Sequence, residues 1–153
     1  MSLRSKGRAF ALQMLFQWEV GRQNPQRIQD GFWRMARAEK TTRQFANSLF
    51  EETAAAVGEL DPLIAEHSRN WRPERMALID RAILRLAAYE IRSGKTPPKV
   101  VLNEAVELAK QFSSEEAARF VNGVIDSVWH SLEKERSEKQ KDAKEKKTAA
   151  DEE

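Results

Sequence analysis

The sequence predicts an all-α protein of about seven helices, arranged as two small bundles packed against each other. Apolar residues recur three and four positions apart along most of the first 132 residues, which is the spacing of one helix face. The breaks between these segments carry glycine, proline, asparagine or serine, which end or start helices. No segment alternates apolar and polar residues as a half-buried strand would. We expect the bundles to span about residues 5–70 and 72–134.

The N-terminal segment combines a basic start with an apolar helix. Residues 1–8, MSLRSKGR, carry three cations and no apolar periodicity, so we expect a flexible arm or a first helical turn that orders on binding. Residues 9–20, AFALQMLFQWEV, are apolar around most of a helix circumference, which predicts a buried element. Gly21 and Asn24-Pro25 are expected to end this helix.

Later helices are predicted from their apolar stripes and their end signals. Gly58 is expected to end the third helix, and Asp61-Pro62 to start a short fourth one, because proline is favoured at the first helical position. Trp71-Arg72-Pro73 is expected to separate the bundles, since proline keeps the residue before it extended. The predicted ranges are about 26–39, 41–57, 62–69, 74–92, 99–112 and 113–132.

The last of these helices has the clearest start. Ser113 and Glu116 have the spacing of a capping box, in which each side chain accepts from the backbone amide of the other. Phe120 lies about 100° from the middle of the apolar stripe, and Arg119 points away from the core. An aromatic ring beside a guanidinium suits a stacked base and its phosphate. The alternative is that Phe120 packs on a neighbouring helix and Arg119 is solvated.

Charge is unevenly distributed along the chain. Residues 1–43 hold nine basic and three acidic residues, whereas residues 44–132 hold ten and thirteen. A basic first third on a near-neutral body is typical of a surface that binds polyanions, the alternative being ordinary surface charge. Residues 135–153 are almost entirely charged or small, have no core face, and are expected to form a disordered, solvated tail.

The chain lacks the residues that are characteristic of several classes of function. The chain has no cysteine and no glycine-rich phosphate loop, and His67 and His130 are far apart. Glu104 and Glu107 share a helix face, but a solvated face or a local salt bridge explains them better than acid–base catalysis. We therefore expect no enzyme, no cofactor and no metal. Without an apolar run of about 20 residues or a signal peptide, we expect a cytoplasmic protein with no membrane contact.

Two segments carry a resemblance to a known family. Residues 99–126, KVVLNEAVELAKQFSSEEAARFVNGVID, and residues 79–90, IDRAILRLAAYE, resemble the C-terminal half of the NusB family of bacterial transcription antitermination factors. The similarity runs from about Arg4 to about Trp129 and is weak between residues 23 and 72. The resemblance implies a single NusB-like helical domain over residues 1–134.

The resemblance also implies a function. NusB proteins bind the boxA element of nascent RNA together with the ribosomal protein NusE, and the complex helps RNA polymerase resist termination, notably on ribosomal RNA operons. Family members often have a denser arginine run at the start and a tyrosine where this chain has Phe16. RNA contacts would fall on Arg4, Lys6, Arg8, Phe16, Arg119 and Phe120, with Glu116 beside them; Glu74 and Asp80 would meet NusE.

Two other functions are compatible with the same sequence. The same fold could serve as a protein-interaction module without RNA binding of its own, which would need an exposed apolar patch. It could also form a homodimer or larger assembly that hides the RNA surface until the partner arrives. RNA binding that is lost when Arg119 and Phe120 are changed would favour the antitermination factor over the interaction module.

Overall fold

The computed structural model describes residues 2–69 and 72–152, which form six α-helices and one 3₁₀ turn without any strand in these ranges. The all-α prediction is therefore confirmed. The elements are α1 (Leu3–Gly21), α2 (Pro25–Met35), α3 (Lys40–Glu66), the 3₁₀ turn η1 (Pro73–Arg75), α4 (Leu78–Ser93), α5 (Pro98–Phe112) and α6 (Glu115–Asp151).

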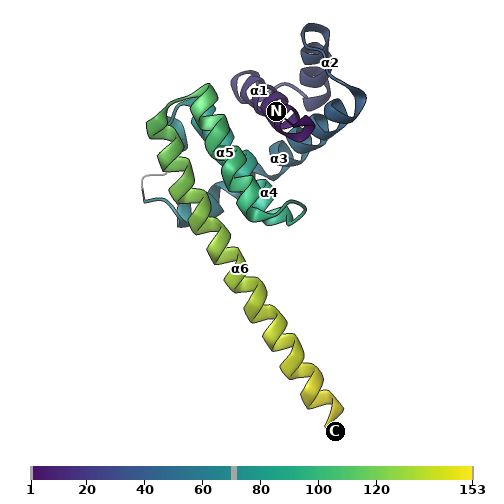
Figure 1. Ribbon diagram of the computed structural model, residues 1–153, viewed down its shortest axis with the longest axis vertical. Helices are drawn as coiled ribbons and strands as arrows, with labels where there is room; N and C mark the ends of the chain where they lie inside the picture. Colours follow the sequence, from purple (N-terminus) through teal and green to yellow (C-terminus); the bar gives the residue numbers. More distant parts are fainter. Residues whose placement is uncertain (1, 70–71, 153) are drawn as a thin grey trace.

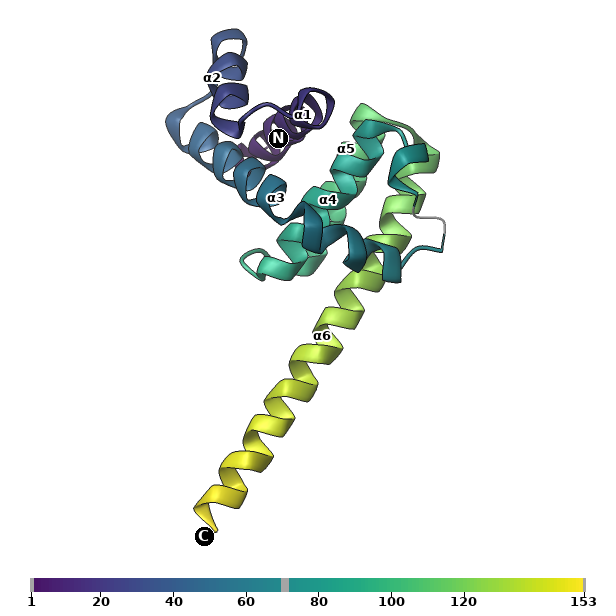
Figure 2. The ribbon, with the colours of Figure 1, turned by 180° about the vertical axis from the view of Figure 1, so that it is seen from behind.

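The helices form two groups that share one core. Helices α1, α2 and α3 pack together, and α4, α5 and the first half of α6 form a second group beside them (Figures 1 and 2). Both α1 and α3 also contact α4, which joins the groups. The core runs through both, with Leu15, Phe50, Ile83 and Val121 almost fully buried. No helix in the described ranges is long and apolar enough to cross a membrane.

Helix α3 replaces two predicted helices with one. Neither Gly58 nor Pro62 interrupts it, so the expected end and restart are wrong, and the helix count is six rather than about seven. Pro62 only removes the hydrogen bond to the carbonyl of Gly58, and both residues are exposed to water. Leu60 and Ile64 are fully buried between and after them, and this burial keeps the helix continuous.

The long helix of the second group begins later than predicted. Helix α4 begins at Leu78 rather than at residue 74, because Pro73–Arg75 turn as a 3₁₀ helix and Ala77 is extended, with ψ 135°. Glu74 consequently lies on η1 and not on α4. Of the predicted boundary between the bundles, Trp71 lies outside the described residues.

The start of α6 differs by one residue from the predicted capping box. Ser114, not Ser113, is the N-cap, and its hydroxyl oxygen accepts from the amide of Ala117 at 3.0 Å. Ser113 instead caps the end of α5, where its amide donates to the carbonyl of Ala109. Two adjacent serines made the choice ambiguous in sequence. The shift leaves Glu116 in the first turn, exposed.

The C-terminal segment also differs from the expectation of a disordered tail. Helix α6 continues through Asp151 and projects away from the body (Figures 1 and 2). Its residues from Glu133 onward are exposed, so lysine, glutamate and alanine propensities and i,i+4 charge pairs must stabilise it without a core. The start of this exposed segment is anchored to the end of α4 by Arg136, which donates to the carbonyls of Ile91 and Arg92 at 3.3 and 2.8 Å.

Candidate nucleic-acid interface

The basic start of the chain is helical. Ser2 caps α1 by accepting from the amide of Ser5 at 3.1 Å, so of the two expected forms the structure has the helical turn. Gly7 allows α1 to pack closely on α3, because a Cβ there would lie 2.5 Å from Cδ1 of Phe45. Helix formation places Arg4 and Lys6 on exposed positions of α1.

Arg8 differs from the two cations that precede it. Its side chain is 3% exposed, and its Nε and Nη2 donate to the two carboxylate oxygens of Glu90 in α4 at 2.8 and 2.9 Å. Its guanidinium also lies 5.4 Å from the ring centroid of Phe45. The prediction that Arg8 contacts RNA is therefore not supported by its position, because the guanidinium is buried and already bonded.

Arg4 and Lys6 remain available on different sides of α1. The Arg4 guanidinium lies 5.5 Å from the centroid of Phe45, yet the residue is exposed. Lys6 borders a hollow of about 440 Å³ between α1, the α2–α3 connection and the end of α5. These two side chains carry the accessible positive charge of the first turns.

Phe16 lies further along α1 and is 38% exposed, one turn before Val20, which is 63% exposed. The intervening Glu19 accepts from Arg81 at 2.9 Å and from Arg85 at 2.6 Å, both in α4. This contact holds the second half of α1 against the start of α4. Part of the Phe16 ring is thus available to a ligand on a rigid surface.

Ion pairs hold α1, α3 and α4 together where the second half of α1 meets the start of α4. Arg85 is buried and also donates two hydrogen bonds to the carboxylate of Asp61 in α3, at 2.9 and 2.8 Å. Burial disfavours the charged guanidinium, but its bonds to Asp61 and Glu19 outweigh this and raise the pKa of Arg85 above its ordinary value. Helices α1, α3 and α4 therefore meet at one compensated ionic cluster.

The start of α6 presents the aromatic residue and the cation that the sequence singles out. Arg119 is exposed, and Phe120 is half-buried with part of its ring packed against the core. Glu116 is exposed one turn earlier. Packing on one side and partial exposure on the other would hold the ring in place for stacking, beside a solvated guanidinium.

The hollow beside Lys6 brings α1 and the end of α5 into one region. It is lined on one side by Lys6, Phe10 and Gln13 of α1 and on another by Gln111 and Phe112, the last residues of α5. Helix α6 begins at residue 115, three positions after Phe112. Segments more than 100 residues apart in sequence therefore flank one hollow.

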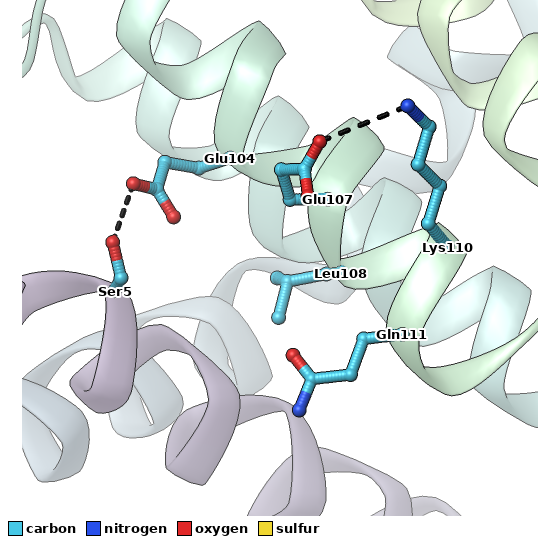
Figure 3. Close-up of a pocket in the computed structure, with 6 residues that line it drawn as sticks. All are labelled: Ser5, Glu104, Glu107, Leu108, Lys110 and Gln111. Carbon is cyan, nitrogen blue, oxygen red and sulfur yellow. Dashed lines mark hydrogen bonds and ion pairs between the residues drawn. The ribbon is translucent and has the colours of Figure 1, made fainter. Parts of the chain in front are cut away.

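A second hollow, of about 460 Å³, lies between α1 and the outer face of α5 and has the opposite character (Figure 3). Ser5 donates to Glu104 at 2.6 Å, and the Lys110 amine lies 3.8 Å from Glu107 (Figure 3). The two carboxylates thus engage neighbouring groups and are not paired with each other. The described residues hold no cluster of three metal-ligand side chains. Two carboxylates make this side unfavourable for a polyanion.

Comparison with known proteins shows the family of the chain. The NusB family signature matches residues 5–130. The chain belongs to the NusB family. It is 45% identical to the transcription antitermination protein NusB of Koribacter versatilis over 138 residues, covering 89% of this chain and 94% of that protein. The NusB of Sorangium cellulosum is 43% identical, covering 86% and 95%.

Solved NusB structures have the same fold. A crystal structure of NusB and NusE in complex with dsRNA superposes with a TM-score of 0.77 at 26% identity, covering 86% of this chain and 98% of the solved one. The solution structure of NusB from Aquifex aeolicus gives 0.76 at 26% identity, covering 88% and 93%. The family match ends at residue 130, so most of the exposed part of α6 lies beyond the shared NusB region.

The two acids that the NusB resemblance assigns to NusE lie on different elements. Glu74 is exposed on η1, whereas Asp80 is half-buried in the first turn of α4. One carboxylate oxygen of Asp80 is buried without a hydrogen-bond partner in the described part of the chain. The two acids lie six positions apart in the chain, Glu74 just before α4 and Asp80 in its first turn.

Proposed function

We propose that this protein is a non-catalytic transcription antitermination factor that binds boxA-type single-stranded RNA of nascent transcripts, notably from ribosomal RNA operons, together with the ribosomal protein NusE. The observation that carries the proposal is the exposed Arg119 beside the partly exposed Phe120 on α6, inside the NusB family match. The similarity to a NusB protein solved with NusE and dsRNA supports it. The complex would act on RNA polymerase in the cytoplasm.

The RNA surface that we propose uses two kinds of contact. Arg4, Lys6 and Arg119 bind phosphates, and each contact makes affinity fall with added salt. Phe16 and Phe120 stack on bases, at about 1–3 kcal/mol for each stacked base. Arg8 is left out because Glu90 holds it, and Glu116 borders the surface.

NusE would bind through the acids before and at the start of α4. Glu74 is exposed and can meet a basic side chain, whereas Asp80 is half-buried, with one carboxylate oxygen shielded from solvent. Such charges act more on the rate and specificity of association than on raw affinity. Glu74→Gln should therefore slow association with NusE, most clearly at low salt.

The interaction module without RNA binding is the second candidate. The exposed apolar side chains of Phe16 and Val20, one turn apart on α1, favour it because they offer a partner two adjacent contacts. A self-associating form of the protein is a further possibility that this candidate includes. Native mass spectrometry at several protein concentrations tests that form directly.

The deciding experiment is a fluorescence titration with three RNAs: a boxA-like single strand, a scrambled single strand and the boxA-like strand annealed to its complement. Each is measured with and without NusE at two salt concentrations. We expect tight, salt-dependent binding of the boxA-like strand, strengthened by NusE. Equal binding of all three RNAs would contradict sequence-selective recognition. Binding of NusE with no RNA binding at all would favour the interaction module.

A further inference from the structure

The hollow of about 440 Å³ beside Lys6 has the composition of a nucleotide site. Its volume lies within the range of about 300–1,000 Å³ that small-ligand sites occupy. Four segments build it: α1, the α2–α3 connection, the first turn of α3 and the end of α5. The side chains around it include two cations, two amides and two phenylalanines, namely Lys6, Arg37, Gln13, Gln111, Phe10 and Phe112.

The α2–α3 connection supplies a second cation, Arg37. It is exposed, comes directly after Ala36, the C-cap of α2, and lines the hollow together with Lys6. Its neighbours Arg34 and Lys40 are also exposed, and Glu39 is the one acid that lines this hollow. A guanidinium and an ammonium facing one hollow favour an anionic ligand, and guanidinium suits phosphate oxygens in particular.

We propose that this hollow binds one nucleotide of the RNA, with Arg37 on its phosphate and the amides of Gln13 and Gln111 on its base or ribose. The Gln13 amide nitrogen donates to the carbonyl of Ala9 at 3.1 Å, so its oxygen is the atom that would accept from the ligand. The site rests on the proposed function and deepens it. The end of α5, which lines the hollow together with Lys6, leads into α6, the helix that carries Arg119. The RNA strand therefore runs from the start of α6 across the hollow to the α2–α3 connection.

The test compares two exposed arginines in the binding of a labelled boxA-like single strand by the full chain with NusE. Arg37→Ala removes the proposed phosphate contact, and Arg27→Ala, on α2 and away from the hollow, removes the same charge. We expect Arg37→Ala to weaken binding about tenfold. The slope of log affinity against log salt should become shallower by about 0.7. Arg27→Ala should change affinity less than about twofold.

A second variant separates the contribution of charge from that of an uncharged hydrogen-bonding group. Gln13→Ala should weaken binding by a similar factor at every salt concentration, because an amide releases no counterions. Equal binding by the Arg37→Ala and Arg27→Ala proteins, with wild type binding normally, would exclude the site and leave the proposed function intact. If wild type itself fails to bind the RNA with NusE present, the proposed function fails and the site fails with it.

Discussion

Arg8 of α1 and Glu90 of α4 form a two-bond ion pair at 2.8 and 2.9 Å, with side chains only 3% and 9% exposed. The residues are 82 positions apart in sequence and belong to different helix groups. The pair therefore ties the two groups together, and it takes away from the proposed RNA surface a cation that the NusB resemblance assigns there.

Loss of one member of this pair should destabilise the fold. Arg8→Ala leaves the Glu90 carboxylate buried without its partner, and we expect a loss of about 3–5 kcal/mol in the free energy of unfolding, measured in urea. The double change Arg8→Met/Glu90→Met should recover much of this loss, because it removes both charges. A loss below about 1 kcal/mol for Arg8→Ala would show that the pair is not buried in solution.

Close packing of α1 on α3 gives a second prediction with a built-in control. Gly7→Ala should lower stability by about 1–3 kcal/mol, because its Cβ would meet the ring of Phe45. Gly31→Ala in α2 meets nothing within 4 Å and should instead raise stability by about 0.5–1 kcal/mol. Thermal unfolding of both variants checks this contrast. A neutral or stabilising Gly7→Ala change would contradict the close approach of the helices.

Tyr89 provides a pH-dependent signal, since it is the one tyrosine in the sequence. Burial and its hydrogen bond to Glu52 raise the pKa of the phenol to about 12. The raised pKa favours the folded state while the phenol is neutral. This stabilisation is present below about pH 10 and is lost as the pH rises toward 12. Ultraviolet titration should give this pKa, and Glu52→Gln should lower it. A wild-type pKa near 10 would contradict the contact.

The projecting end of α6 should contribute helicity without contributing stability. Deleting residues 139–153 keeps Arg136 and its bonds to the end of α4. We expect an unchanged thermal midpoint and a smaller far-ultraviolet circular dichroism signal, because these residues are helical but exposed. If the truncated and full-length proteins gave the same total circular dichroism signal, residues 139–153 would not be helical in solution, which would contradict the helix beyond residue 138.

The fold class could be predicted because each helix buries one periodic apolar face. Helix boundaries were less predictable where local signals compete with burial. Pro62 looks like a helix start, yet buried Leu60 and Ile64 carry α3 through it. The paired serines before α6 differ only in the backbone each adopts, with ψ −103° at Ser113 and 166° at Ser114.

Site residues were predictable to the extent that their burial depends on their own helix. Arg119 and Phe120 could be placed from the apolar stripe of α6, and their exposure agrees with that placement. Arg8 could not be separated from Arg4 and Lys6, because its partner Glu90 comes from another helix group. Arg37 falls within the helix predicted over 26–39, but α2 ends at Met35, and only the fold shows that Arg37 lies in the α2–α3 connection beside this hollow.

One comparison tests most directly whether RNA binds across α1 and the start of α6, as proposed. Affinity for a boxA-like single strand is measured for wild type, for Arg119→Ala/Phe120→Ala and for Lys99→Ala, an exposed cation at the far end of α5. We predict a loss of about 2 kcal/mol or more for the double variant, and a small change for Lys99→Ala, with folding intact in both. Equal affinities for the double variant and wild type would contradict the proposed surface.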